Sequence, residues 1–186
     1  SEAGVDGLIL VSAGAGGHGG TLNPMSLISE VKKVFNKTLI LSGCISTGTD
    51  VAAALQMGAD FAYMGTRFIN TIESRADDGY KEMIINSDAN DIVYTAAVSG
   101  VNANFLKPSL EAMGITEDMW KNTKKIDFGK ELSAAEAEAK AWKTIWSAGH
   151  GVTSITDCPS VKDLVKNLKS EFINSVKKQS ELLENF

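Results

Sequence analysis

The sequence predicts an α/β fold in which roughly the first third of the chain forms a parallel sheet flanked by helices. Apolar segments typical of strands alternate there with segments of helical pattern: strands are expected at 5–11, 38–41 and 59–64, and helices at 23–35 and 51–57. Strands that are buried on both faces and separated by helices favour parallel pairing. Each expected strand runs into a turn of small residues, at 14–20, 43–46 and 65–67. The pattern alone is consistent with an open doubly wound sheet and with a closed barrel.

Capping residues set the limits of the two helices. Asn23 is expected as the N-cap of the first helix, and Pro24 as its first residue, because proline lacks the N–H that would be unpaired there. The segment Thr-Gly-Thr-Asp at 47–50 introduces the second helix, and Gly58 closes it as a C-cap.

The turns at the carboxyl ends of the strands favour a barrel with an anion site. Active sites of (β/α)₈ barrels gather at that end, and phosphate commonly lies at the loops after the last two strands. Gly43 and Gly65 follow successive strands at the spacing of one strand–helix unit. A dinucleotide-binding fingerprint would instead need its glycines to open a helix directly, and the glycine run at 14–20 opens none.

Composition excludes several classes of function. The chain is 44% hydrophobic and 22% charged, with a formal net charge of −5, and it has no basic block of the kind that binds nucleic acid. Cys44 and Cys158 lie far apart, so neither a disulfide framework nor a metal site is expected. No apolar run approaches the ~20 residues that span a bilayer, and the start has no signal-peptide pattern. We therefore expect a cytoplasmic protein without a nucleic-acid or membrane partner.

One histidine is placed where it can meet a ligand. His18 lies in the glycine-rich run at 12–20, directly after the first expected strand. Glycines let backbone N–H groups approach a phosphate or a flat ring, and an imidazole, with an ordinary pKa of about 6.5, suits proton transfer. Two interpretations remain at this point: a catalytic group exposed to a ligand, and a histidine in a mobile loop.

An ordered set of motifs resembles the nitronate monooxygenase family, formerly called the 2-nitropropane dioxygenases. The motifs are AGGHGG at 15–20, SGCI at 42–45, AALQMGAD at 53–60, YMGTRF at 63–68, SGVNANFL at 99–106 and WSAGHGV at 146–152. The chain is similar to the carboxyl-terminal portion of that family, whose members are FMN-dependent TIM barrels. The similarity covers nearly the whole chain.

The resemblance implies a role for each matching position. His18 corresponds to the catalytic base, and Gly16 and Gly17 to residues beside the flavin. The residues that would cradle the FMN phosphate are Gly43, Cys44, Tyr63, Met64, Gly65 and Thr66. Cys44 departs from the family, which usually has glycine there, and its Cβ is expected to fit the turn only with a negative φ. Backbone geometry, rather than nucleophilic chemistry, is the role that the pattern gives to Cys44.

The implied reaction is oxidation of a small alkyl nitronate, or of its parent nitroalkane, with dioxygen as the final electron acceptor. The flavin carries the redox step. His18 would remove the α-proton of a neutral nitroalkane or, when protonated, hold the nitronate anion. Two alternatives stay open. One is an FMN-dependent enoyl-acyl-carrier-protein reductase that oxidises NADH, a class that resembles the same Gly-Gly-His and Met-Gly-Thr pattern; the other is a non-catalytic phosphate-binding barrel fragment.

Residues 73–186 are predicted to form a helical extension that packs on the barrel portion at 1–72. Helices are expected at 80–84, 132–146 and 161–168, with no further strand. Trp142 and Trp146 have the spacing of one helix edge and are expected in the core. The resemblance implies that 99–104 lines the substrate side. His150 is interpreted as a lid residue, as a residue that supports the site from behind, or as a plain turn residue.

Three strands are fewer than the eight of a barrel, which needs about 250 residues. We therefore expect the first five strands of the barrel to be missing from this chain. Either the chain is a fragment of a longer product, or a partner supplies the rest, as a second copy or a complementing amino-terminal chain. Three parallel strands alone would leave edges and apolar faces uncovered.

Overall fold

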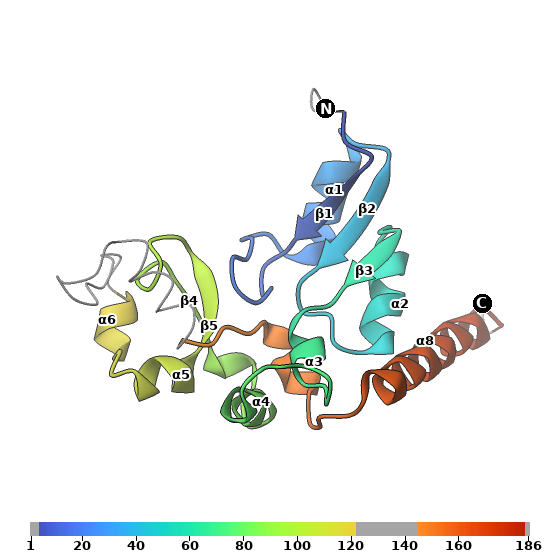
Figure 1. Ribbon diagram of the computed structural model, residues 1–186. Helices are drawn as coiled ribbons and strands as arrows, with labels where there is room; N and C mark the ends of the chain where they lie inside the picture. Colours follow the sequence, from blue (N-terminus) through green and yellow to red (C-terminus); the bar gives the residue numbers. More distant parts are fainter. Residues whose placement is uncertain (1–3, 122–144, 185–186) are drawn as a thin grey trace.

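A three-stranded parallel sheet forms one end of the molecule (Figure 1). The computed structural model describes residues 4–121 and 145–184. Its strands β1 (Gly7–Val11), β2 (Thr38–Ser42) and β3 (Phe61–Tyr63) pair in that order, with Ile9 opposite Ile40 and Ile40 opposite Phe61. Helices α1 (Pro24–Lys32) and α2 (Gly48–Gln56) connect the strands. The predicted alternation of strands and helices over this part of the chain is confirmed.

The predicted caps of both helices are confirmed. The Asn23 side chain accepts a hydrogen bond from the Ser26 N–H at 3.0 Å, and Pro24 opens α1. Thr47 and Asp50 form a reciprocal capping box at the start of α2, which satisfies backbone N–H groups that have no partner within the helix. Gly58 follows α2 with a φ of +100°, the left-handed conformation typical of the residue after a helix.

The two faces of the parallel sheet differ in burial. Leu10, Leu39 and Leu41 point to a core that is completed by Ile28, Phe35 and Ala54 and their neighbours. On the opposite face, Ile9 and Phe61 are 54% and 60% exposed. Because neighbouring residues of a strand point to opposite faces, this second face is an apolar surface that no described residue covers.

A second sheet, of two strands, follows the parallel sheet along the chain. The remaining elements are α3 (Thr66–Ile69), α4 (Asp78–Ile85), η1 (Ala89–Asp91), β4 (Ile92–Thr95), β5 (Ala103–Leu106), α5 (Lys107–Ala112), α6 (Glu117–Lys121), η2 (His150–Ser154) and α8 (Val161–Leu183). The expectation of no strand after residue 72 is wrong, because β4 and β5 pair antiparallel. Ala103 and Asn104 are poor strand formers on their own, and complete burial of Ala103, Phe105 and Leu106 stabilises β5.

Helix α8 is longer than predicted and packs along α2 (Figure 1). Ser160 caps it, and Glu171 accepts a hydrogen bond from the Gly48 N–H at 2.6 Å. A Cβ at Gly48 would overlap the Leu168 carbonyl oxygen, so this glycine allows the two helices to approach closely. Despite its length, α8 is too polar to cross a membrane, and no other described helix has the required length and apolarity.

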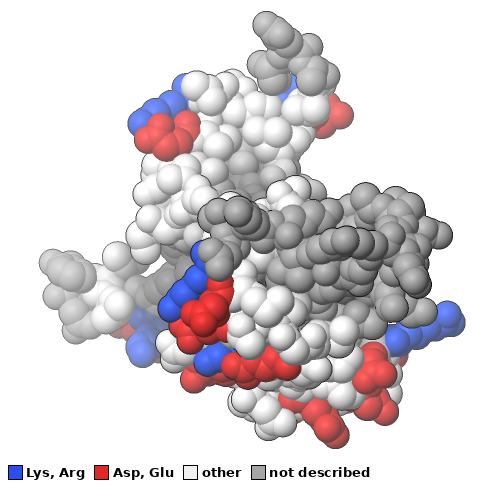
Figure 2. Space-filling view, turned by 90° about the vertical axis from the view of Figure 1, so that its left-hand side faces the viewer, with Lys and Arg blue, Asp and Glu red and all other residues white. Residues whose placement is uncertain are grey.

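Most of the helix expected at 132–146, with Trp142, lies outside the described residues. Trp146 is described and packs against a buried apolar cluster, with its ring stacked on Tyr80 at a centroid distance of 5.1 Å. Trp146 is thus half-buried at the edge of the core and lies outside any helix, so the prediction of a core residue is confirmed only in part and the predicted helix does not extend to this residue. On the face shown in Figure 2, acidic and basic side chains lie beside one another, and among the described atoms of that face neither sign forms a broad patch.

Candidate functional site

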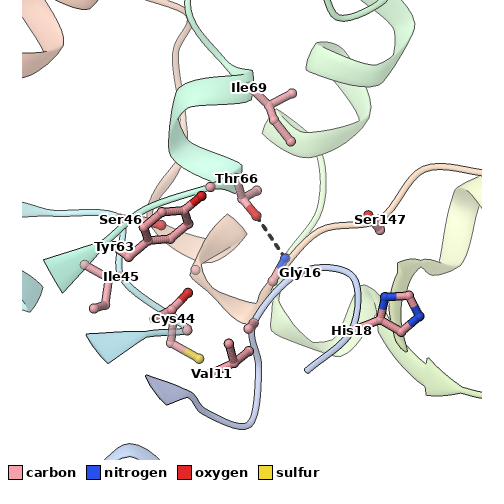
Figure 3. Close-up of a pocket in the computed structure, with 16 residues that line it drawn as sticks. Val11, Gly16, His18, Cys44, Ile45, Ser46, Tyr63, Thr66, Ile69 and Ser147 are labelled. Carbon is pink, nitrogen blue, oxygen red and sulfur yellow. Dashed lines mark hydrogen bonds between the residues drawn. The ribbon is translucent and has the colours of Figure 1, made fainter. Parts of the chain in front are cut away.

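A cavity of about 350 Å³ opens at the carboxyl ends of the three parallel strands (Figure 3). It is lined by Val11, Ala15, Gly16, His18, Ser42, Gly43, Cys44, Ile45, Ser46, Tyr63, Gly65, Thr66, Ile69, Ser147, Gly149 and Gly151. The structure therefore brings together seven of the nine site residues that the sequence singled out. Gly17 and Met64 are not among the lining residues, and Met64 packs against the core under the sheet.

Two loops meet tightly at the floor of the cavity. The His150 N–H donates to the Gly14 carbonyl oxygen at 2.9 Å, and the Gly149 N–H donates to Thr66 Oγ1 at 3.1 Å, the bond drawn dashed in Figure 3. A Cβ at Gly16 would lie 2.9 Å from the Gly149 nitrogen. The glycine at position 16 is therefore required by the contact between the loops, whatever else it contacts.

His18 lies at one end of the cavity, near Ser147, while Cys44 and Tyr63 lie at the other end (Figure 3). Gly17, the residue before His18, has a φ of +68° and pairs with Asn104 of β5 in an isolated antiparallel bridge. The His18 loop is thus bonded to the second sheet as well as following the first.

Cys44 adopts a conformation that the sequence analysis did not expect. Its φ is +58°, the only positive value at a non-glycine residue in the described part of the chain, so the expectation of a negative φ is wrong. Gly43 before it has a φ of +118° and lies so close to Ser12 Oγ that a Cβ there would overlap it. The turn is therefore fixed by its neighbours, and Cys44 takes a left-handed conformation that costs an ordinary residue about 1–2 kcal/mol.

The Cys44 side chain is held as a thiol. Burial raises its pKa above the ordinary value, and the nearby Asp50 carboxylate raises it further. Its Sγ lies 3.6 Å from the Ala13 carbonyl oxygen, a partner that suits an S–H donor. Because the thiolate is the reactive form, this environment disfavours nucleophilic chemistry at Cys44.

Gly65 differs from the other glycines of the cavity. A Cβ built on it would meet no atom within 4 Å, and its φ is −110°, which any residue can adopt. Packing within the described chain therefore does not require glycine at this position. A side chain there would instead project into free space at the cavity wall.

Sequence reasoning did not assign a role to the part of the wall formed by Ser147, Gly149 and Gly151. These residues follow β5 by about forty positions, and their motif was noticed while only His150 received an interpretation. His150 itself is not a lining residue; its ring packs against Gly14, where an added Cβ would lie 2.7 Å from Nδ1. The interpretation of His150 as a lid or supporting residue, as against a plain turn residue, stays a prediction.

Two contacts fix this wall from outside. The Tyr80 hydroxyl donates to the Ser147 carbonyl oxygen, and burial raises the pKa of Tyr80 to about 12. Arg67, only 5% exposed, donates to Asp157 Oδ1 at 2.6 Å and to the Asp157 carbonyl oxygen at 3.2 Å. In residues 4–121 and 145–184, no group of three or more His, Cys, Asp and Glu side chains could hold a metal ion.

Comparisons with known proteins give one family. The family model described as nitronate monooxygenase matches residues 1–171. The chain is 31% identical over 189 residues to a nitronate monooxygenase from Paraburkholderia phytofirmans, covering 94% of this chain and 51% of the relative. It is also 31% identical over 132 residues to a probable nitronate monooxygenase from Staphylococcus aureus, covering 63% of this chain and 37% of the relative.

Solved structures resemble the described fold. FabK from Thermotoga maritima matches with a TM-score of 0.77 and 27% identity, over 97% of this chain and 58% of that one. A nitroalkane oxidase from Streptomyces ansochromogenes matches with a TM-score of 0.72 and 25% identity, over 96% of this chain and 55% of that one. The chain thus spans about half the length of the Paraburkholderia relative and of FabK.

Proposed function

This chain belongs to the nitronate monooxygenase family, and from that premise we propose that it forms the flavin-binding half of an enzyme that oxidises alkyl nitronates or nitroalkanes with dioxygen. The observation that carries the proposal is the cavity at the strand ends, which places His18 opposite the turns of Gly43 and Gly65. Its volume of about 350 Å³ falls within the range of small-molecule sites, roughly 300–1,000 Å³.

The cavity fits a phosphorylated flavin, and we propose FMN. Among the described residues, no lysine or arginine lines it, so a phosphate there would be bound by backbone N–H groups and hydroxyls, as in other glycine-rich anion sites. The open space beside Gly65 suits a ligand that approaches the backbone where a Cβ would obstruct it. Thr66 Oγ1 accepts from Gly149 and keeps its own hydrogen to donate. The bound flavin would supply the two-electron redox chemistry that no side chain provides.

Among the proposed phosphate contacts, Cys44 is the weakest. The Asp50 carboxylate that raises the pKa of Cys44 would also repel a phosphate dianion held close to it. We therefore assign the main phosphate contacts to Gly43, Gly65 and Thr66, with Tyr63 and Gly16 against other parts of the cofactor. Gly17 and Met64 would act through the geometry of their loops.

His18 is proposed as the proton-handling group. An imidazole at the cavity can take the α-proton of a neutral nitroalkane, and its protonated form can hold a nitronate anion. These two roles separate the substrates, because a nitronate has already lost the proton that a neutral nitroalkane must give up. Ser147, at the same end of the cavity, would offer a hydroxyl to the substrate.

We further propose that the parallel sheet forms the last three strands of a (β/α)₈ barrel at 1–72, with 73–186 as an extension packed on it. The exposed apolar face that carries Ile9, Val11, Phe61 and Tyr63 has the character of a barrel interior, which is packed with side chains. The other strands of the barrel would cover this face in the whole protein.

The test begins with the visible absorption spectrum of the whole protein and the identity of any chromophore released by heat. FMN, together with nitronate-dependent oxygen uptake, is the expected result, and absence of flavin would overturn the proposal in favour of a non-catalytic phosphate-binding protein. A His18→Ala variant is expected to lose turnover on a neutral nitroalkane about 100- to 10,000-fold, and much less on the preformed nitronate. Equal losses on the two substrates would contradict the assignment of His18 as the base.

Enoyl reduction with NADH is the second candidate function. The solved structures that resemble this chain include FabK as well as a nitroalkane oxidase, so the fold does not separate the two. Rapid reduction of the bound flavin by NADH, followed by turnover of an enoyl thioester, would favour the second candidate. Slow reduction by NADH with fast reduction by a nitronate is the result expected here.

A further inference from the structure

We propose that Tyr94 and Asn104, which face each other across the β4–β5 hairpin, are positioning residues that hold His18 at the cavity. The two residues are partners in the antiparallel register. Each bonds the glycine-rich loop beside His18. The inference rests on the proposed function, because the position of His18 matters only if its ring handles a substrate proton.

Asn104 makes three hydrogen bonds to the loop before His18. Its Nδ2 donates to the Ala15 carbonyl oxygen at 2.7 Å, and its backbone N–H donates to the Gly17 carbonyl oxygen at 2.8 Å. The Gly17 N–H returns a bond to the Asn104 carbonyl oxygen at 3.3 Å. Asn104 is only 2% exposed, and a buried amide that lost these partners would carry the cost of unpaired polar groups.

Tyr94 bonds the loop after His18. Its hydroxyl donates to the Gly19 carbonyl oxygen at 3.2 Å. Gly19 also lies against Asn104, since a Cβ there would come within 3.0 Å of Asn104 Nδ2. The residues on both sides of His18 are thus attached to the same cross-strand pair.

The hairpin is a suitable support because it is rigidly packed. Ala103 and Phe105, on either side of Asn104 in the sequence, are fully buried in one apolar cluster, and Leu106 is fully buried in a second. The loop, in contrast, is rich in glycine and has much conformational freedom of its own. Contacts with other parts of the fold must therefore hold the loop in one conformation. A misplacement of about 1 Å in a catalytic group can cost on the order of 100-fold in rate.

The test compares three variants of the whole, flavin-loaded protein. Asn104→Asp keeps the size of the side chain and removes the donor to Ala15, and Tyr94→Phe removes only the hydroxyl. Asn167→Asp makes the same charge change at an exposed position of α8, on a helix that contributes no residue to the cavity lining, and serves as the matched control. With a neutral nitroalkane, kcat should fall about 10- to 100-fold in Asn104→Asp and about 3- to 10-fold in Tyr94→Phe. KM and turnover of the preformed nitronate should change much less, and the control should behave as the parent.

A second readout does not depend on activity. In NMR spectra of protein with ¹³C-labelled histidine, the His18 ring signals should shift or broaden in both variants and stay unchanged in Asn167→Asp. His150, the other histidine of this chain, gives a reference signal in the same spectrum. If Asn104→Asp does not fold, Tyr94→Phe decides the test. Tyr94 is 42% exposed and the substitution retains its ring, so this variant should fold.

Unchanged His18 signals, or equal losses on the neutral and anionic substrates, would overturn the positioning role. The failure of the proposed function would look different. In that case His18→Ala would be as active as the parent, or no nitroalkane would react at all, while the His18 signals would still respond to the hairpin variants.

Discussion

The two sheets of the molecule are stabilised in different ways. The parallel sheet has three strands but one apolar face exposed, with Phe61 at 60%. The β4–β5 hairpin has only two strands, yet every residue of β5 is buried. The loop with His18 follows the parallel sheet in sequence and is bonded to the hairpin in space. The comparison teaches that the loop with His18 is bonded to the better-packed small sheet as well as joined to the sheet that precedes it.

The largest expected effect on the free energy of unfolding comes from a cavity made in the core that packs on the β4–β5 hairpin. Phe105→Ala removes a fully buried aromatic ring and should lower the free energy of unfolding by about 3–5 kcal/mol, measured by urea denaturation of the whole protein. Val101→Ala, at a position 57% exposed just before β5, is the control and should change it by less than about 0.5 kcal/mol. Similar small effects of both variants would mean that the hairpin is not the stable support described above.

A smaller effect should separate the two kinds of glycine in the cavity. Gly16→Ala places a methyl group 2.9 Å from a backbone nitrogen and should cost about 1–3 kcal/mol of stability. Gly65→Ala meets nothing within 4 Å, so stability should stay the same or rise by up to about 1 kcal/mol. Flavin affinity, measured by fluorescence titration, should nevertheless fall about tenfold in Gly65→Ala, because the methyl group occupies space assigned to the ligand. Unchanged affinity would remove Gly65 from the cofactor site.

The smallest expected effect on the free energy of unfolding concerns Tyr80, whose hydroxyl bonds Ser147 in the cavity wall. This effect appears only at high pH. Burial raises the pKa of Tyr80 from 10 to about 12, so the unfolded chain loses this proton first as pH rises. The contribution of Tyr80 to stability is therefore complete below pH 10 and is lost between pH 10 and 12, by up to about 1.4 kcal/mol per pH unit.

Tyr80→Phe tests this dependence. Urea denaturation of parent and variant should show the difference in unfolding free energy shrinking as pH rises from 10 to 12. The other tyrosines titrate in both proteins and cancel in the difference. A constant difference over that range would contradict the raised pKa of Tyr80.

Local signals in the sequence were sufficient for the first part of the fold. Asn23, Pro24, Thr47 and Gly58 mark helix ends by interactions within a few residues, and the strands between them follow from apolar runs. That the turns at 14–20, 43–46 and 65–67 meet could be predicted for the same reason, because parallel strands bring their carboxyl ends to one edge. The individual residues of the site followed from the family resemblance.

The rest of the site depends on contacts between distant residues. Asn104 and Ala15 are 89 positions apart, and Thr66 and Gly149 are 83 apart, so neither pair leaves a local pattern. The strand character of β5 also comes from burial rather than from its residues. The sign of φ at Cys44 was wrong because intrinsic preference was weighed without the packing of Gly43 on Ser12.

The left-handed backbone at Cys44 has a consequence for mutational search. Cysteine and glycine codons differ by a single base, so a residue that relieves this conformation is one nucleotide change away. Random mutagenesis followed by selection for heat resistance should therefore recover glycine at position 44 early and repeatedly. A single substitution at position 44 can therefore stabilise this protein without rearranging its fold.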